Sequence, residues 1–429
     1  MQIGLDFGTT NSSVARLTKP GEVELARFPQ RDGITESFRS LLYLERLREA
    51  GRITIKSWSG PSGIEHYLSA EDKGRLIQSL KSFLSSRSLK TTEIFGRHFK
   101  LEDLIANILR DLRELAEKQF GAPVRRVVVG RPVVFVGAQS AEDNRYASER
   151  LKLSFEKAGF EQIFFEYEPV AAAYHYESTL DHDELILIGD FGGGTSDFSL
   201  LRVGPSRSRA DGDSPGVLGN EGLPLAGDAF DAKIVRHLVS PALGAGSLLD
   251  SAGKLLPAPN WVYFKVERWH YLSFLKSRET LNMLRSVKAQ AVEPEKIEAL
   301  LYLIQHDLGY QLHRAVQQVK IGLSQYEEEV FRFEDGDVLL EIPVARGEFE
   351  SWISEELAAI EQSMAALLAK TGIHAKDVDK VFLTGGSSFV PAVRRIFELQ
   401  FGSHKIRTGD EFTSVARGLA LRGAGAQLS

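Results

Sequence analysis

The sequence predicts an α/β protein of more than one domain. Short apolar runs alternate with amphipathic helical patterns along the 429 residues, as is typical of α/β folds. One pattern of strand and turn occurs twice, as Gly4-Leu5-Asp6-Phe7-Gly8-Thr9-Thr10 and as Gly189-Asp190-Phe191-Gly192-Gly193-Gly194-Thr195. At roughly 150 residues for each domain, a chain of this length holds two or three domains.

Regular elements are expected in the following order. Apolar runs predict strands at 127–129, 185–188 and 381–383. Apolar residues recur at steps of three and four over 101–119, which predicts a helix that Gly121 and Pro123 end. Similar patterns predict long helices over 297–326 and 349–368, and the alternation over 330–342 predicts a β-hairpin that turns at Gly336. Residues 204–222 are rich in Gly, Pro, Ser and Asp and are expected to form an exposed loop.

The composition excludes several classes of protein. The chain has no cysteine, so it contains neither disulfide bonds nor thiolate zinc sites. A net charge of −6 argues against a broad nucleic-acid surface. Apolar runs fall short of the roughly 18 residues that a membrane span requires, and the N-terminus does not have the pattern of a signal peptide. We therefore expect a cytoplasmic protein that binds neither nucleic acid nor membrane.

The two repeated turns have the composition of phosphate-binding loops. Glycines allow a sharp turn whose backbone N–H groups approach an anion, hydroxyl groups add donors, and an Asp can hold hydrated magnesium. A single such turn is also common in hairpins and would be weak evidence. Two copies half a chain apart predict two related lobes that bind one nucleotide between them.

A third glycine-rich turn follows the strand at 381–383. It has the sequence Gly385-Gly386-Ser387-Ser388 and leads into a helix that Pro391 opens. Such a turn permits close approach of a ligand to a helix N-terminus, although a tight connection between strand and helix explains an isolated glycine pair equally well.

These motifs together resemble the ATPase domain of the seventy-kilodalton heat-shock chaperone family, within the actin and sugar-kinase superfamily. The two repeated turns match its phosphate loops, Glu168-Pro169-Val170-Ala171-Ala172-Ala173 its connecting helix, and Gly385-Gly386-Ser387 its adenosine motif. Shorter matches are Gly227-Asp228-Ala229-Phe230-Asp231 and Lys81 within Ser79-Leu80-Lys81-Ser82-Phe83.

The fold that the resemblance implies is an actin-like ATPase with two ribonuclease-H-like lobes, each with an inserted smaller subdomain. Lobe I would span 1–183 with a subdomain at about 30–100, and lobe II would span 184–405 with a subdomain at about 231–348. Residues 406–429 would form a C-terminal helix that returns to lobe I.

The resemblance also implies roles for individual residues, with ATP or ADP and Mg²⁺ as cofactors. Asp6 and Asp190 would hold magnesium, mostly through water, and Lys81, Glu168, Thr195 and Asp190 would serve hydrolysis. The nucleotide would be bound by Gly8, Thr9, Thr10, Asn11, Gly192, Gly193, Gly194, Thr195, Gly227, Lys320, Gly385, Gly386, Ser387 and Phe389. Lys81 by itself would be interpreted as a solvated helix lysine, and Asp197 is expected to support the second loop.

The sequence departs from the family pattern at the adenosine pocket. Beside Lys320, Gln317 and Ile321 stand where the family has charged residues, and Phe389 replaces an arginine that stacks on the base. An aromatic ring can stack on adenine but brings neither charge nor donor. Residues 257–294 lengthen the outer subdomain of lobe II, and their apolar and aromatic spacing is most simply interpreted as helix core.

We expect a magnesium-dependent ATPase that acts as a chaperone-like switch for an unidentified protein partner or client, without the peptide-binding β-sandwich of the chaperones. A nucleotide-binding pseudo-ATPase is the alternative. A small-molecule kinase would need a base and a substrate pocket that no motif indicates, and the Glu-Pro and Gly-Gly-Ser motifs make a filament-forming actin relative less favoured. The tripeptide Asp190-Phe191-Gly192 also occurs in protein kinases, but their other motifs are missing from the sequence.

Overall fold

The α/β class is confirmed in the computed structural model, which describes residues 1–19, 21–30, 33–49, 52–70, 74–177, 180–205, 216–251, 253–408 and 414–425. The chain divides into two compact units. The first comprises Met1–Gly227, Ala359–Ser388 and Val393–Ser429, and the second comprises Asp228–Ala358 and Phe389–Ala392.

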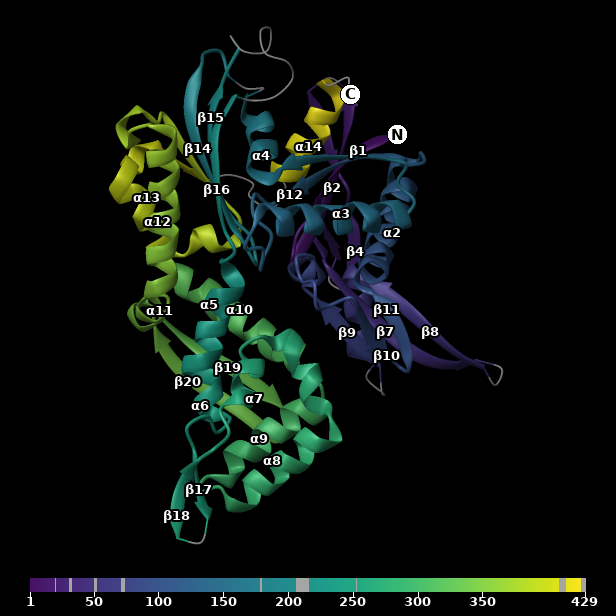
Figure 1. The fold of residues 1–429 in the computed structure, drawn as a ribbon, viewed down its shortest axis with the longest axis vertical. Helices are drawn as coiled ribbons and strands as arrows, with labels where there is room; N and C mark the ends of the chain where they lie inside the picture. The colour runs from purple at the N-terminus through teal and green to yellow at the C-terminus, as the bar shows by residue number, and fades with distance from the viewer. Residues whose placement is uncertain are drawn as a thin grey trace. The chain divides into compact units, whose positions relative to one another are not determined.

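The first unit contains two mixed sheets (Figure 1). The first sheet has the order β13-β12-β1-β2-β3, with β6 beside β2; its parallel strands are β1, β12 and β13, and β2 runs antiparallel to its neighbours. Its strands are β1 (Gln2–Phe7), β2 (Asn11–Lys19), β3 (Glu22–Leu25), β6 (Phe38–Arg39), β12 (Arg126–Arg131) and β13 (Gln162–Tyr167).

The second sheet repeats this topology. Its order is β16-β15-β14-β21-β22, in which β14, β15 and β16 form an antiparallel meander and β21 and β22 run parallel to β14. Its strands are β14 (Glu184–Phe191), β15 (Ser196–Val203), β16 (Gly216–Leu223), β21 (Lys380–Thr384) and β22 (Ile406–Thr408). The repetition seen in two short turns of the sequence therefore extends to whole sheets.

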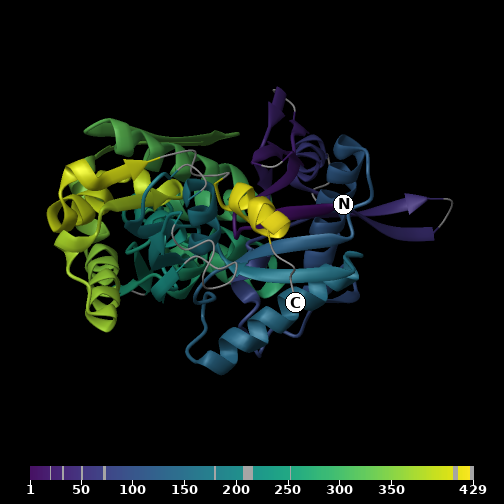
Figure 2. The ribbon, with the colours of Figure 1, turned by 90° about the horizontal axis from the view of Figure 1, so that it is seen from above.

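Two helices, α4 (Glu168–Glu177) and α14 (Ser414–Gly425), pack against strands of these sheets and against each other. Their buried residues share one apolar cluster with β12, β14 and β15. A side chain at Gly418 of α14 would collide with the backbone of Ala171 in α4, and one at Gly4 of β1 would collide with the backbone of α14. Figure 2 shows α14, in yellow, beside the strands of the first sheet. Glycine therefore permits both close approaches.

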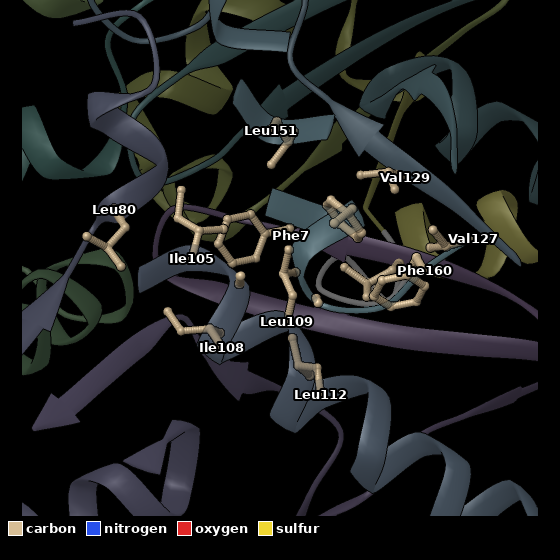
Figure 3. Packing of buried hydrophobic residues seen from close by; sticks show 14 of the residues in the cluster. Phe7, Leu80, Ile105, Ile108, Leu109, Leu112, Val127, Val129, Leu151 and Phe160 are labelled. Atoms are coloured by element: carbon tan, nitrogen blue, oxygen red, sulfur yellow. The ribbon is translucent and has the colours of Figure 1, made fainter. Parts of the chain in front are cut away.

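A larger apolar cluster lies on the other side of the first sheet. Helix α2 (Leu101–Phe120), which the periodicity predicted, contributes Ile105, Ile108, Leu109 and Leu112, and α3 (Ala141–Lys157) contributes Leu151. Figure 3 shows these side chains around Phe7 and Val129 of the sheet. The core therefore fixes β1 at the residue that follows Asp6.

Further elements of the first unit lie between β3 and α2. The hairpin of β7 and β8 projects away from the first sheet (Figures 1 and 2) and pairs with β9 through β7. The elements are β4 (Phe28–Gln30), β5 (Gly33–Thr35), β7 (Leu41–Glu49), β8 (Arg52–Ser59), α1 (Gly60–Ser69), β9 (Arg75–Gln78), the 3₁₀ helix η1 (Leu80–Phe83), β10 (Thr91–Ile94) and β11 (Arg97–Lys100).

The second unit is mainly helical, with two hairpins. The hairpin predicted over 330–342 is confirmed, since β19 and β20 pair in antiparallel register. The elements through β20 are α5 (Gly227–Ile234), the π-helical turn η2 (Val235–Val239), α6 (Ser240–Ala242), β17 (Leu248–Ser251), β18 (Lys254–Pro257), α7 (Trp261–Val266), η3 (Trp269–Lys276), α8 (Arg278–Gln290), α9 (Pro294–Gln305), α10 (Gly309–Gln325), β19 (Glu328–Asp335) and β20 (Val338–Ala345).

The remaining elements begin with α11 (Arg346–Trp352) and α12 (Ser354–Thr371). The single helix predicted over 349–368 is therefore broken at Ile353, between these two helices. They continue with η4 (Ala375–Asp377), η5 (Gly386–Phe389), α13 (Pro391–Phe401) and η6 (Ser403–Lys405). Helix α13 begins at Pro391, as predicted.

The structure also corrects other sequence-based predictions. The single helix predicted over 297–326 is two helices, because Asp307 between them takes a left-handed conformation with a φ of 57°. Residues 216–222 are strand rather than loop, since β16 pairs with β15; residues 206–215 of that predicted loop lie outside the described residues. In the segment 257–294 the predicted core is confirmed at Val262, Tyr263 and Val266, which are buried, but Trp261 and Phe264 are 44% and 61% exposed.

Within the described ranges of the chain, no helix combines the length and the apolar character that a membrane crossing requires.

Candidate functional site

The first repeated turn joins β1 to β2. Phe7 pairs with Ser12 across the turn, and Asp6 lies opposite Ser13. A side chain at Gly8 would collide with the carbonyl of Asn11. Glycine is therefore required for the chain to reverse here, and Asp6 is left at the end of a strand whose neighbours are buried.

The second turn reproduces the first residue by residue. Phe191 pairs with Ser196, Asp190 lies opposite Asp197, and the amide of Gly192 donates to the carbonyl of Thr195 at 2.9 Å. The adenosine-type turn packs behind it: Gly385 has a φ of +81°, and a side chain there would collide with the carbonyl of Phe191. Both conditions at that position favour glycine.

The two turns lie close together in the first unit. A Cβ placed on Gly194 of the second turn would lie 3.5 Å from Thr9 Oγ1 of the first and 3.6 Å from Ser82 Oγ. Ser82 belongs to η1, so the segment that carries Lys81 approaches the same point. The structure therefore brings together the two turns and the segment of Lys81, which are separate motifs in the sequence.

Lys81 and Glu168 form a buried ion pair in this cluster. Lys81 Nζ donates to Glu168 Oε1 at 2.7 Å, and the side chains are 6% and 9% exposed. Lys81 lies in a one-turn 3₁₀ helix that follows Ser79 in a left-handed conformation, and Glu168 is the first residue of α4. The interpretation of Lys81 as a solvated helix lysine is therefore wrong.

The carboxyl groups around this pair repel one another. Burial, and next the charge of Glu168, raise the pKa of Asp190 to about 6, while Thr384 and Lys81 act in the opposite direction. Burial and Glu168 likewise raise the pKa of Asp6 and of Asp197 well above the usual range. Burial alone would lower the pKa of Lys81, but Glu168 and Asp6 outweigh it and raise that pKa. The site therefore keeps Lys81 charged and holds an excess of negative charge.

Two further contacts orient the aspartates, and the first involves Thr384, which is not among the predicted site residues. Thr384 Oγ1 at the end of β21 donates to Asp190 Oδ1 at 2.7 Å. Asp197 Oδ1 accepts from the backbone amides of Val133 at 2.8 Å and Val134 at 3.4 Å. Asp197 thus ties β15 to the segment after β12, and the position of Thr384 directly before Gly385 was the available signal for its role.

The remaining nucleotide-site candidates fall into both units. In the first unit, the amide of Gly227 donates to the carbonyl of Gly192 at 3.3 Å, and Ser387 is buried. In the second unit, Lys320 Nζ lies 2.6 Å from Asp231 Oδ1, while Ile321 and Phe389 are 58% and 52% exposed. Asp231 closes the motif Gly227-Asp228-Ala229-Phe230-Asp231, but its position in the sequence does not indicate that it pairs with Lys320.

The donor set of the turns suits a hard cation held partly by water. Among the residues that the structure describes, no group of three or more His, Asp or Glu side chains has the geometry of a metal site. Asp6 and Asp190 each keep part of their surface accessible, and carboxylates are the ligands that Mg²⁺ combines with water. These two residues fit a hydrated magnesium ion.

Comparison with known proteins identifies the family. The model of the family described as "Hsp70 protein" matches residues 72–246 and 304–426, which is more than half of the chain. The chain belongs to the Hsp70 family. Hsp70 membership gives it the actin-like ATPase fold, in agreement with the duplicated sheets.

Several relatives of this Hsp70 chain are called Chaperone protein DnaK. The proteins of Thermosipho africanus and Thermosipho melanesiensis are 25% and 24% identical to it over 423 and 425 residues. That of Thermotoga neapolitana is 24% identical over 423 residues. Each alignment covers 98% of this chain but only 58% or 59% of the relative, so the chain spans under two thirds of the DnaK length.

Proposed function

We propose that this Hsp70-family chain binds ATP with magnesium, hydrolyses it slowly, and acts as a nucleotide-driven switch for a protein partner or client. The observation that carries the proposal is the convergence of two duplicated Asp turns on the buried Lys81–Glu168 pair. Family membership supports a nucleotide as the ligand.

In this proposal the turns bind phosphate and the pair serves the chemistry. The backbone N–H groups of Gly8–Thr10 and Gly193–Thr195 donate to phosphate oxygens, and the hydroxyls of Thr9 and Thr195 add donors. Gly192, whose amide donates to the carbonyl of Thr195, shapes the second turn. Asp6 and Asp190 hold hydrated magnesium, which neutralises phosphate charge when it is bound. A cation held there would also offset the effects of burial, and next of the charge of Glu168, that raise the pKa of both aspartates.

Lys81 and Glu168 have complementary roles at the transferred phosphoryl group. Because its pKa is raised, Lys81 stays an ammonium at neutral pH and can balance charge that develops in the transition state. Glu168 accepts a hydrogen bond from Lys81 and has a second carboxylate oxygen that can orient the attacking water. Phosphoryl transfer needs such charge balance and alignment more than a covalent catalyst.

The residues expected to hold the adenosine favour a second candidate function, that of a pseudo-ATPase that binds nucleotide without turnover. Ile321 and Phe389 are exposed apolar residues where the family has charged ones, so fewer polar groups are available to hold the base. Lys320, paired with Asp231, remains the charged group of that segment. Absence of turnover with retained binding would favour this candidate.

Binding is tested by the effect of nucleotide on thermal unfolding. ADP with magnesium should raise the melting temperature, because a ligand that binds the folded state stabilises it by mass action. Thr195→Val should weaken the shift, and Asp6→Ala should make the shift less dependent on magnesium. No shift of the wild-type protein at millimolar nucleotide would refute the proposal.

The proposal places the chain in the cytoplasm with a protein partner or client. Nucleic acid and membranes are not among the partners that we propose. The expectation that the chain works without a peptide-binding β-sandwich stays a prediction. A fluorescent apolar heptapeptide tests it: micromolar binding that ATP releases would contradict that expectation.

A further inference from the structure

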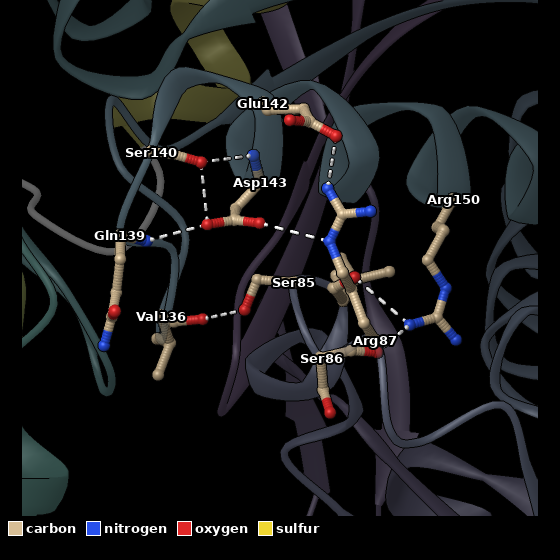
Figure 4. A network of polar contacts seen from close by, with 10 residues as sticks. Ser85, Ser86, Arg87, Val136, Gln139, Ser140, Glu142, Asp143 and Arg150 are labelled. Carbon is tan, nitrogen blue, oxygen red and sulfur yellow. Dashed lines mark hydrogen bonds and ion pairs between the residues drawn. The ribbon is translucent and has the colours of Figure 1, made fainter.

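Arg150 of α3, a buried residue, binds the backbone of the segment that carries Lys81. Its guanidinium contacts the end of η1 and the chain that follows it, and Figure 4 shows Arg150 beside this segment. The carbonyl oxygens that accept its hydrogen bonds are those of Phe83 at 3.3 Å, Leu84 at 3.2 Å, Ser86 at 3.1 Å and Leu89 at 3.1 Å. One side chain therefore fixes four carbonyls within seven residues.

Glu102 of α2 completes this arrangement. Arg150 Nε donates to Glu102 Oε1 at 2.5 Å, and the two side chains are 6% and 10% exposed. The carboxylate neutralises the buried guanidinium, which would otherwise be costly in free energy. Arginine suits this position because its planar group donates in several fixed directions, which the single ammonium of lysine cannot do.

A second set of contacts also holds this segment, and its exposed member, Arg87, provides a matched control. Ser85 Oγ donates to the carbonyl of Val136 at 2.5 Å. Arg87 donates to Glu142 at 2.8 Å and to Asp143 at 3.3 Å, but its side chain is 52% exposed (Figure 4). An exposed ion pair of this kind contributes little.

We propose that Arg150, neutralised by Glu102, is a positioning residue that holds Lys81 in place for phosphoryl transfer. This inference rests on the proposed function. The amide of Leu84 donates to the carbonyl of Lys81 at 3.2 Å, so the carbonyls that Arg150 binds begin within the same 3₁₀ turn. A displacement of about 1 Å at a reacting group can reduce a rate by about 100-fold.

The test compares Arg150→Lys with Arg87→Ala in steady-state ATP hydrolysis. Arg150→Lys keeps a positive charge opposite Glu102 but cannot bind four carbonyls. We expect kcat to fall by about tenfold or more, with KM and ADP affinity within about twofold of wild type. Arg87→Ala should leave all three unchanged. A kcat of Arg150→Lys within about twofold of wild type would overturn the proposal.

A double-mutant cycle separates positioning from a general structural effect. If Arg150 acts through Lys81, then Arg150→Lys should lower kcat by less than about twofold in a Lys81→Ala background. An equal loss in both backgrounds would show that Arg150 acts by another route. Should Arg150→Lys not fold, Arg150→Met with Glu102→Leu carries the same test without an unpaired buried charge.

Hydrogen exchange of residues 79–89 distinguishes failure of this inference from failure of the proposed function. Undetectable turnover of the wild-type protein would refute hydrolysis but would not affect this readout. Arg150→Lys should speed exchange in the segment by about tenfold or more, and Arg87→Ala should not. Equal exchange in both variants would refute the anchoring role of Arg150.

Discussion

The buried pair of Lys81 and Glu168 predicts an asymmetric double-mutant cycle in stability. The two side chains are 6% and 9% exposed, and their N···O distance is 2.7 Å. Lys81→Met leaves Glu168 as an unpaired buried charge, which typically costs about 3–5 kcal/mol. It also removes the cation that lowers the pKa of Asp6 and Asp190. We therefore expect Lys81→Met to lower the free energy of unfolding by an amount at the upper end of that range.

Glu168→Gln should cost far less. It removes the charge that raises the pKa of Asp6, Asp190 and Asp197, and it leaves Lys81 facing the charges of Asp6 and Asp197. We expect Glu168→Gln to lower the free energy of unfolding by less than about 2 kcal/mol. The double variant Lys81→Met with Glu168→Gln should have a free energy of unfolding about 1–3 kcal/mol higher than that of Lys81→Met.

The assay for this cycle is urea unfolding of the four proteins without nucleotide at pH 7.5. Midpoints and slopes should be compared together, because a changed slope would indicate a changed denatured state. Equal losses in the two single variants, with an additive double variant, would refute the account of the pair and of the negative charge around it.

Three further predictions follow from single contacts. Gly418→Ala should lower the free energy of unfolding by about 3 kcal/mol or more, because a Cβ would collide with the backbone of Ala171; Gly347→Ala, with nothing within 4 Å, should change it by less than about 1 kcal/mol. Burial raises the pKa of Asp190 to about 6, so its carboxyl is protonated at pH 5. The magnesium concentration for half-maximal stabilisation by ADP should therefore rise by about tenfold from pH 7.5 to pH 5. Asp190→Asn should flatten this dependence of the magnesium concentration on pH. Thr384→Val removes the 2.7 Å hydrogen bond to Asp190 and should raise the same magnesium concentration by about tenfold, while Thr384→Ser should restore it; a Thr384→Val protein with wild-type magnesium dependence would contradict that role.

The apo protein should also lose stability as pH rises, because Asp190 binds its proton more tightly when folded. With a folded pKa of about 6 against an ordinary value of 3.8, the loss occurs between about pH 4 and pH 6 and is complete above pH 6. Burial and Glu168 cause the same direction of shift in Asp6, which adds to the trend. Thermal unfolding from pH 4 to pH 7 measures it, with Asp190→Asn as the control.

The features that sequence predicted best are those set by local chemistry. Helix α2 follows from its apolar periodicity and from Gly121, which ends it with a φ of 72°. The turn of the hairpin at Gly336 follows from its Asp-Gly sequence. The two Asp turns were found because glycine is needed wherever a chain reverses this sharply, as the collision at Gly8 shows.

The features that sequence did not predict depend on contacts between distant segments. Residues 216–222 have the composition of a loop, but a side chain at Gly219 would meet Thr371 Cγ2 at 2.5 Å, so glycine there reflects the packing of α12 on a strand. The apolar pattern continues through Asp307, so the break between α9 and α10 is not visible in periodicity. Nor does the sequence of α3 reveal that Arg150 faces inward to carbonyls more than 60 residues earlier.

The most direct test of the central claim is phosphate release from ATP and magnesium under single-turnover conditions, with wild-type protein in excess over ATP. The account predicts a slow but measurable rate that Lys81→Ala reduces by about 100-fold or more, while ADP affinity is largely retained. A wild-type rate indistinguishable from buffer would contradict hydrolysis and favour the pseudo-ATPase. An unchanged rate in Lys81→Ala would remove the Lys81–Glu168 pair from the proposed chemistry.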